Sequence, residues 1–188
     1  MLDEVGVKYE REDWGRGFKS TDDPVFRKIN PVGVVPVIDD GDFRLRESNS
    51  IVRYLAEKHG RADLYPSDPK ARATTGIPGW TGPRPTSPTA CGRSSTRLSS
   101  RTRRSPTRSR AALRSGPSRW SVLEQHLTAK GPYVMGASFT IGDIPVGLVV
   151  NRWFSIDFKK PEFKAVSAYY DRLAERPGYK AHGRNGTP

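Results

Sequence analysis

The sequence predicts an α/β domain followed by an all-helical domain. In the first third, an apolar run at Val34–Ile38 is followed by a turn and by the alternating segment Phe43–Arg46, which is a β-hairpin pattern between helical segments. In the last third, the apolar residues recur at helical spacing over Trp120–Leu127, Ile144–Trp153 and Phe163–Leu173. The chain has 188 residues, which is enough for one domain or two small ones.

The first elements of the chain are short. Leu2–Val5 is typical of the last turn of a helix that Gly6 closes. Val7–Glu12 alternates in polarity, which predicts a short strand. Asp23-Pro24 then predicts the start of a helix, because Asp caps helix N-termini and Pro suits the first helical position. That helix is expected to end at Asn30-Pro31.

The hairpin and the helix after it complete the α/β part. Val34–Ile38 is a compact apolar run, so we expect a buried strand. Asp39–Asp42 is typical of a turn, and the alternating segment after it is the second strand. Helical spacing over Ile51–Lys58 predicts a helix with Ser48 or Asn49 as its cap. The predicted order is helix end, strand, helix, strand, strand, helix.

The start of the second helix of the last third has a specific pattern. Thr140 and Asp143 have the spacing of a capping box, with Asp in place of Glu or Gln. Phe139 and Ile144 stand at the two positions of a hydrophobic staple. We interpret this pattern as structural and not catalytic.

The remaining helical patterns predict core packing. Trp120, Leu123 and Leu127 share one helix face. Trp153 and Phe154 are expected in the core rather than in contact with a substrate. The last helix is expected to end near Arg176–Gly178, because Pro and Gly follow helix ends.

The net charge of +12 does not describe the whole chain. Ten Arg, no Lys and no acidic residue lie between Thr74 and Arg119, so this segment alone carries +10. It also holds nine Ser, eight Thr and six Pro. Such a composition predicts a basic, low-complexity and disordered segment, because no helical period survives so many prolines.

This basic segment has two interpretations. It could be a linker that binds RNA, DNA or an anionic lipid, but it lacks interleaved aromatic residues for base stacking. Alternatively it is GC-rich coding sequence translated in a shifted frame. In the shifted frame, each new codon is made from the last base of one codon and the first two bases of the next. Over Pro78–Gly82 this reading allows the sequence Trp-Met-Asp-Trp. The nucleotide sequence of the gene tests this interpretation, which we favour.

Several classes of protein are excluded by the composition. The single Cys91 excludes an internal disulfide framework and a zinc site with several cysteines. No apolar run approaches the roughly 20 residues that cross a bilayer, so we expect no membrane partner. The first residues do not have the pattern of a signal peptide, and a cytoplasmic protein is therefore expected.

Two motifs in the first third carry a family resemblance. Asn30-Pro-Val-Gly-Val-Val-Pro-Val-Ile-Asp-Asp-Gly41, followed by Leu45-Arg-Glu-Ser-Asn-Ser-Ile-Val-Arg-Tyr-Leu55, resembles the thioredoxin-like domain of cytosolic glutathione transferases. The Thr140–Asp143 pattern and the phrase Ala174–Tyr179 resemble the helical domain of that family. The resemblance covers about residues 1–73 and 120–180.

The domain organisation follows from this resemblance. We expect an incomplete thioredoxin-like domain over residues 1–66, a linker over 67–73, the aberrant basic segment over 74–119, and the remainder of an all-α domain over 120–188. The family begins with a strand, a loop and most of a helix that precede the residue matching Leu2. The architecture expected is thus that of a glutathione transferase with part of the α/β domain missing.

The resemblance implies a glutathione site at four residues. The Val35–Pro36 bond would be cis, and the main chain of Val35 would pair with the cysteinyl part of glutathione. Ser48 and its N–H would bind the γ-glutamyl carboxylate, and Glu47 would pair with the ammonium. A helix N-terminus suits a carboxylate, because its N–H groups are unpaired and its dipole is positive. The alternatives are that Pro36 only starts an edge strand and that Ser48 is only a cap.

The reaction implied is attack of the glutathione thiolate on an electrophilic small molecule. Glutathione would be a co-substrate, with no further cofactor and no metal. No residue of this sequence matches the family's catalytic Ser, Tyr or Cys, so we expect little activity. The family's dimer contact lies where the basic segment stands, so a homodimer is allowed but not established. The alternatives are a non-catalytic glutathione-binding or chaperone-like protein and a nucleic-acid binder, and we do not favour nucleic acid as a partner.

Overall fold

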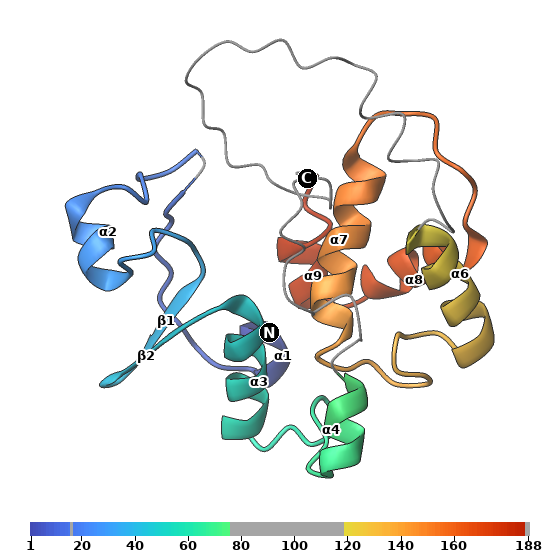
Figure 1. Cartoon of the computed structure of the whole chain (residues 1–188), viewed down its shortest axis with the longest axis horizontal. Coiled ribbons are helices and arrows are strands. Elements are labelled where there is room, and N and C mark those ends of the chain that lie inside the picture. The colour runs from blue at the N-terminus through green and yellow to red at the C-terminus, as the bar shows by residue number, and fades with distance from the viewer. Residues whose placement is uncertain (16, 76–118, 187–188) are drawn as a thin grey trace.

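Two groups of elements pack side by side in the computed structural model, which describes residues 1–15, 17–75 and 119–186 (Figure 1). The first group comprises α1 (Leu2–Val5), α2 (Pro24–Ile29), β1 (Val37–Asp40), β2 (Phe43–Arg46) and α3 (Ser48–Lys58). The second comprises α4 (Pro69–Thr75), α6 (Arg119–Lys130), α7 (Asp143–Ser155), α8 (Lys164–Leu173) and α9 (Pro177–His182). The predicted fold class, a thioredoxin-like α/β part and a helical part, is confirmed.

The short helices of the first group begin and end where local residues predict. Gly6 ends α1 in the left-handed conformation, with φ 71°. Asp23 caps α2, because its carboxylate accepts a hydrogen bond of 2.8 Å from the N–H of Val25. The backbone turns extended at Asn30, which ends α2 before Pro31.

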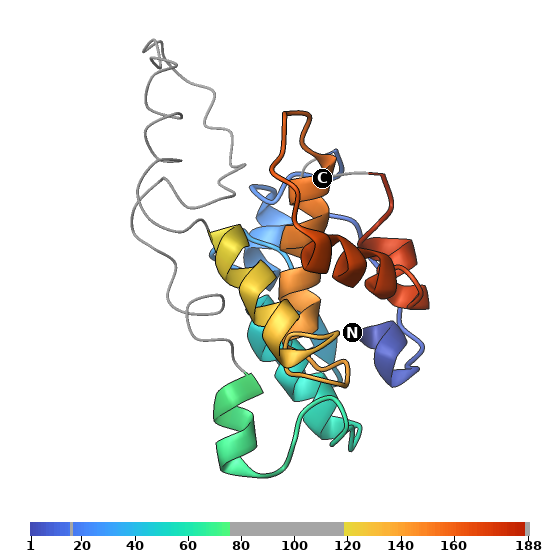
Figure 2. The same cartoon turned by 90° about the vertical axis from the view of Figure 1, so that its right-hand side faces the viewer.

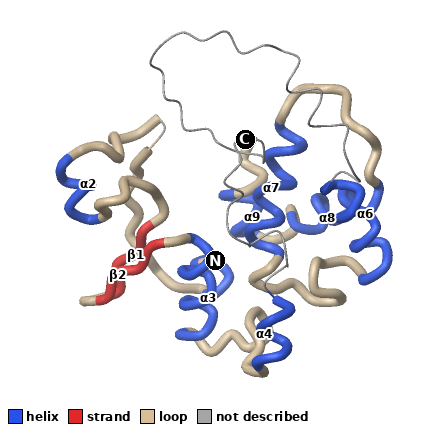
Figure 3. The backbone as a smooth tube through the Cα atoms, viewed as in Figure 1, coloured by secondary structure: helices blue, strands red, loops and turns tan. Residues whose placement is uncertain are grey.

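The hairpin is the only sheet among the described residues (Figure 3). Its antiparallel register sets Val37 opposite Arg46 and Asp40 opposite Phe43. The predicted buried strand Val34–Ile38 is therefore wrong at its start: β1 begins at Val37, and Val34–Pro36 are exposed. With one neighbouring strand, the apolar run has no second strand to cover it. Asp39 and Asp40 lie in β1, and the turn is shorter than predicted.

The strand predicted at Val7–Glu12 does not form. These residues have no ladder partner in the described part of the chain, and the structure shows irregular backbone there. Alternating polarity matches the two faces of a strand, but the backbone N–H and C=O groups still need a neighbouring strand. The prediction was wrong because alternating polarity describes the side chains and does not show whether a neighbouring strand is present.

The core of the helical group lies where α6, α7 and α8 meet (Figure 2). Its buried residues are Leu123, Leu127, Val134, Val146, Val150, Val166, Tyr169, Tyr170 and Leu173. The rings of Trp120 and Trp153 lie 4.4 Å apart, and Phe154 stacks on Tyr170 at 4.6 Å. The predicted packing role of these aromatic residues is confirmed.

A carboxylate from α6 holds the start of α8. The two oxygens of Glu124 accept hydrogen bonds of 3.0 Å each from the N–H groups of Ala165 and Val166. These are first-turn N–H groups without partners inside α8. Glu124 therefore caps a neighbouring helix, 41 residues away in sequence.

Half of the predicted capping box forms at the start of α7, whose N-cap residue is Gly142. The Asp143 carboxylate accepts from the N–H of Thr140 at 2.8 Å, and the Thr140 hydroxyl accepts from the N–H of Gly142 at 3.3 Å. Asp143 is fully buried and also accepts from the N–H of Val134 at 2.9 Å and the hydroxyl of Tyr169 at 3.0 Å. The structural interpretation of this pattern is confirmed.

The segments around the predicted linker and chain end differ from expectation. The helix α8 ends at Leu173, close to the end predicted near Arg176–Gly178, and Pro177 occupies the first position of a further helix, α9, that was not predicted. Residues 67–73, predicted as a linker, include most of α4. Most of the basic segment, residues 76–118, lies outside the described residues. The other domain boundaries remain predictions.

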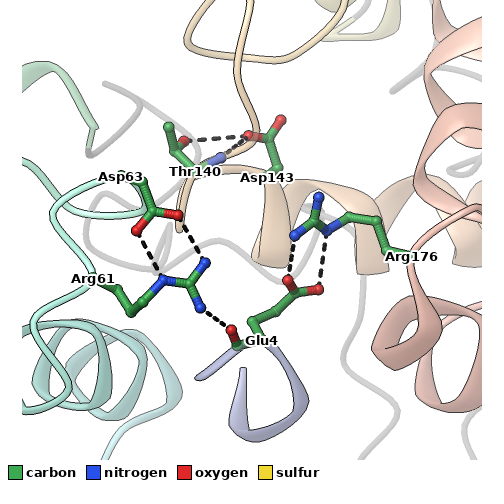
Figure 4. Close-up of polar contacts among 6 residues, drawn as sticks. All are labelled: Glu4, Arg61, Asp63, Thr140, Asp143 and Arg176. Carbon is green, nitrogen blue, oxygen red and sulfur yellow. Dashed lines mark hydrogen bonds and ion pairs between the residues drawn. The ribbon is translucent and has the colours of Figure 1, made fainter. Parts of the chain in front are cut away.

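Polar contacts join the two groups, and Figure 4 draws the one between Glu4 and Arg176 together with the Arg61 contacts that hold α1 to the residues after α3. The Glu4 carboxylate in α1 pairs with the Arg176 guanidinium before α9, with 3.0 Å between Oε1 and Nε. Arg61, itself bound to Asp63 at 2.7–2.8 Å, donates to the Glu4 carbonyl. The N–H of Ile141 donates to the carbonyl of Leu64 at 3.1 Å. The α/β group is thereby attached to the helical group through α1 and through the residues after α3.

Candidate functional site

The four predicted site residues lie at one end of the hairpin. Val37 is opposite Arg46, and antiparallel strands run past each other residue by residue. Pro36 directly precedes β1 and Glu47 directly follows β2, so both residues flank the Val37–Arg46 pair that ends the ladder. All four residues are exposed, and Val35 retains 49% of its accessible surface. The hairpin register thus brings together two motifs that are eleven residues apart.

The Val35–Pro36 peptide bond is cis, as the family resemblance implies. Val35 precedes β1, so its N–H and C=O lie outside the ladder that begins at Val37. A main chain left outside a sheet edge can pair with an extended peptide.

Glu47 and Ser48 stand at the N-terminus of α3. Glu47 is the N-cap residue, and its carbonyl accepts from the N–H groups of Ser50 and Ile51 at 2.9 and 3.0 Å. The expectation that Ser48 or Asn49 caps the helix is wrong, because both lie inside it and no side chain caps it. The first-turn N–H groups and the positive end of the helix dipole thus face an exposed surface that suits a carboxylate.

Glu47 has an unusual backbone conformation. Its φ of 72° is the one positive value at a non-glycine residue among the described residues. The left-handed region costs an L-residue about 1–2 kcal/mol, and such strain clusters at ligand sites. The strained residue lies between β2 and α3, at the end of the hairpin where Val35 also lies.

The loop around Trp14 also borders this site, and the sequence patterns did not indicate it. A β-carbon on Gly15 would lie 3.8 Å from Val35 Cγ2. Gly15 donates to the Lys19 carbonyl at 2.8 Å, and the Lys19 ammonium lies 5.1 Å from the centre of the Trp14 ring. The loop therefore presents a cation and an aromatic ring near Val35. No pattern along the chain indicated this loop, and its turns at Gly15 and Gly17, both with positive φ, are seen only in the structure.

A second polar cluster fixes the hairpin to α3. The Asp40 carboxylate accepts from the Tyr54 hydroxyl at 2.6 Å and pairs with the Lys58 ammonium. The hydrogen bonds from Lys58 and Tyr54 lower the pKa of Asp40, and the bond to Asp40 raises the pKa of Lys58. These contacts hold β1 against α3 at this end of the hairpin. The candidate site lies at the other end and is supported by the same two elements.

Other classes of site are not indicated by the described residues. They contain no group of three or more His, Cys, Asp or Glu side chains placed to hold a metal ion. None of their helices has the length and apolar character needed to cross a bilayer.

The comparisons with known proteins identify the family of the chain. Residues 1–57 match the N-terminal domain family of glutathione S-transferases. A theta class glutathione S-transferase from Xanthomonas axonopodis pv. citri, solved with glutathione bound, is 32% identical, with a TM-score of 0.75 over 97% of this chain and 87% of that one. The chain belongs to the glutathione S-transferase family.

Curated relatives place the chain within the same family. The glutathione S-transferase GstB of Escherichia coli is 28% identical over 195 residues, covering 95% of this chain and 87% of that protein. Glutathione S-transferase F14 of Arabidopsis thaliana is 41% identical over 76 residues, 38% of this chain and 30% of that protein. The protein is glutathione S-transferase-like, and these relatives favour neither a chaperone-like binder nor a nucleic-acid binder.

Proposed function

We propose that this glutathione S-transferase-like chain binds glutathione at Val35, Pro36, Glu47 and Ser48. The observation that carries the proposal is the hairpin register, which places the segments Val35–Pro36 and Glu47–Ser48 at the same end of the hairpin, where α3 begins. The Val35 main chain pairs with the cysteinyl unit, Ser48 and its N–H bind the γ-glutamyl carboxylate, and Glu47 pairs with the ammonium. The cis bond before Pro36 sets the direction of the Val35 main chain.

The reaction proposed is that of the family. The thiolate of bound glutathione attacks an electrophilic carbon, a carbon–sulfur bond forms, and the leaving group departs with its electron pair. Activation of the thiol is assigned to none of the described residues. Glutathione acts as a co-substrate, and the four residues contribute by binding and orienting it.

The partners proposed follow from the same relationship. They are glutathione and an electrophilic small molecule, in a homodimer located in the cytoplasm. The Xanthomonas relative, solved with glutathione bound, supports the first partner.

Replacement of Ser48 by alanine tests the binding proposal. We expect the dissociation constant for glutathione, measured by titration calorimetry on the full chain, to rise about tenfold, because a hydrogen bond to a charged carboxylate is lost. The matched control is Ser50→Ala, since Ser50 is exposed on the same helix two residues on. Absence of glutathione binding to the unchanged protein at millimolar concentration would refute the proposal, as would equal affinities of the two variants.

A further inference from the structure

Asn30 is a fully buried polar residue immediately before the site loop. It ends α2, and the loop from Asn30 to Val35 leads directly into the cis Val35–Pro36 bond. Its side chain has no exposed surface, although Asn is usually found at the protein surface. A buried amide is costly unless its hydrogen bonds are made, so its partners show what it does.

The side-chain amide of Asn30 shapes this loop from inside. Nδ2 donates to the carbonyl of Val34 at 2.7 Å, and Oδ1 accepts from the N–H of Val32 at 3.1 Å. Val34 is the residue just before Val35. The bond to the Val34 carbonyl therefore fixes the peptide plane that joins Val34 to Val35, and with it the direction of the Val35 N–H.

The same oxygen also reaches the other strand of the hairpin. Nη1 of Arg46 donates to Asn30 Oδ1 at 3.2 Å. Arg46 is the last residue of β2, and Glu47 with its positive φ follows at once. Asn30 thus contacts both chain segments that supply the site, on one side through Val34 and on the other through Arg46.

We propose that Asn30 is a positioning residue for glutathione binding, because its side chain holds the Val35 main chain and the Arg46–Glu47 segment in a fixed relation. Resting on the proposed function, this adds a residue that does not touch glutathione. An aspartate at this position keeps the shape and both acceptor contacts but cannot donate to the Val34 carbonyl. Only the hydrogen bond to the Val34 carbonyl is then lost.

Glutathione affinity of folded Asn30→Asp protein tests the inference. Titration calorimetry at a temperature well below melting, with the folded fraction checked by circular dichroism, is expected to give a dissociation constant about tenfold higher than that of the unchanged chain. The matched control is Asn151→Asp, because Asn151 is also buried but lies in α7, where its Oδ1 accepts from Tyr170 at 2.9 Å. The control should lower the melting temperature and leave the dissociation constant unchanged.

If Asn30→Asp does not fold, a second variant, Arg46→Met, still tests the positioning role. Arg46→Met removes only the bond from the exposed strand end, and about threefold weaker binding is expected. Unchanged affinity in the folded Asn30 variant, or in Arg46→Met where the Asn30 variant is unfolded, overturns the positioning role. This outcome is distinct from failure of the proposed function, in which the unchanged protein itself does not bind glutathione and Ser48→Ala has no effect.

Discussion

Asp143→Ala is expected to lower the free energy of unfolding by about 3–5 kcal/mol, the largest loss predicted for this chain. The buried carboxylate accepts from the N–H groups of Val134 and Thr140 and from the hydroxyl of Tyr169, at 2.8–3.0 Å. An alanine leaves the N–H groups of Val134 and Thr140 inside the protein without an acceptor, while the Tyr169 hydroxyl keeps only its 3.3 Å contact with the main-chain carbonyl of residue 143. Each unsatisfied buried donor costs about 1–3 kcal/mol. Urea unfolding followed by tryptophan fluorescence measures the loss.

A second aspartate provides the control for this prediction. Asp171 on α8 pairs with Arg184 at 2.9 Å at the surface, where its side chain is 65% exposed. Asp171→Ala should change stability by no more than about 0.5–1 kcal/mol, because exposed ion pairs contribute little. A loss for Asp143→Ala no larger than that for Asp171→Ala would contradict the assigned role of the buried network.

The same carboxyl group gives a pH dependence of stability. Burial raises the pKa of Asp143 above the ordinary value of an aspartate, and this outweighs the opposite effect of the donors around it. Between the unfolded pKa and the raised native pKa, the folded state binds more protons than the unfolded state. Stability contributed by this group is therefore lost as pH rises through that window.

Asp143→Asn isolates this effect, because an amide does not titrate. The unfolding free energy of the unchanged protein minus that of Asp143→Asn should fall as pH rises from about 4 and level off above the native pKa. A difference that grows with pH over the same range would show that the donors outweigh burial and would contradict the raised pKa.

Arg176→Met is expected to lower the free energy of unfolding by about 1.5–3 kcal/mol. Arg176 pairs with Glu4 through two hydrogen bonds, and its guanidinium lies 3.8 Å from the centre of the Phe139 ring. The Glu4 side chain is only 11% exposed, so removal of Arg176 leaves a poorly solvated carboxylate. Urea unfolding measures the loss. In this variant the α/β group is expected to be attached less firmly to the helical group.

A double substitution and a surface control define this contribution. Glu4→Met combined with Arg176→Met should recover much of the loss, because no charge is left unpaired. Arg11→Met is the control, since Arg11 and Asp13 are 54% and 40% exposed and pair at the surface. Equal losses for Arg176→Met and Arg11→Met would show that the interdomain pair adds nothing beyond a surface contact.

Predictions from sequence succeeded where a few neighbouring residues complete each other's hydrogen bonds. The Asp23 cap of α2 and the Thr140–Asp143 pattern at α7 are of this kind, since donor and acceptor lie within three residues. Predictions failed at Val7–Glu12 and at the start of β1, where the outcome depends on a neighbouring strand. The end of α8 near Arg176 was predicted, but the further helix α9 was not, because proline suits the first position of a helix as well as the residues after a helix end.

The candidate site was only partly predictable for the same reason. Val35, Pro36, Glu47 and Ser48 stand in two motifs whose resemblance to the glutathione transferase family implies glutathione binding. The adjacency of the loop at Gly15 and the buried bridge from Asn30 to Arg46 had no signal that could be read along the chain. Both depend on backbone segments that meet only after the hairpin has formed.

The sequence by itself determined the family resemblance, the main helices with the Asp23 cap of α2, and the two motifs of the proposed glutathione site. These properties depend on side chains that are close together in the sequence. Such side chains stay close in space in any fold, because the chain between them is short. Only the tertiary structure decided that Ser48 is not a cap, that Asn30 holds both sides of the site, and that Glu4 meets Arg176 across 172 residues. Contacts between distant residues depend on how whole elements pack, because burial and pairing of backbone groups select one arrangement among many that the local pattern allows.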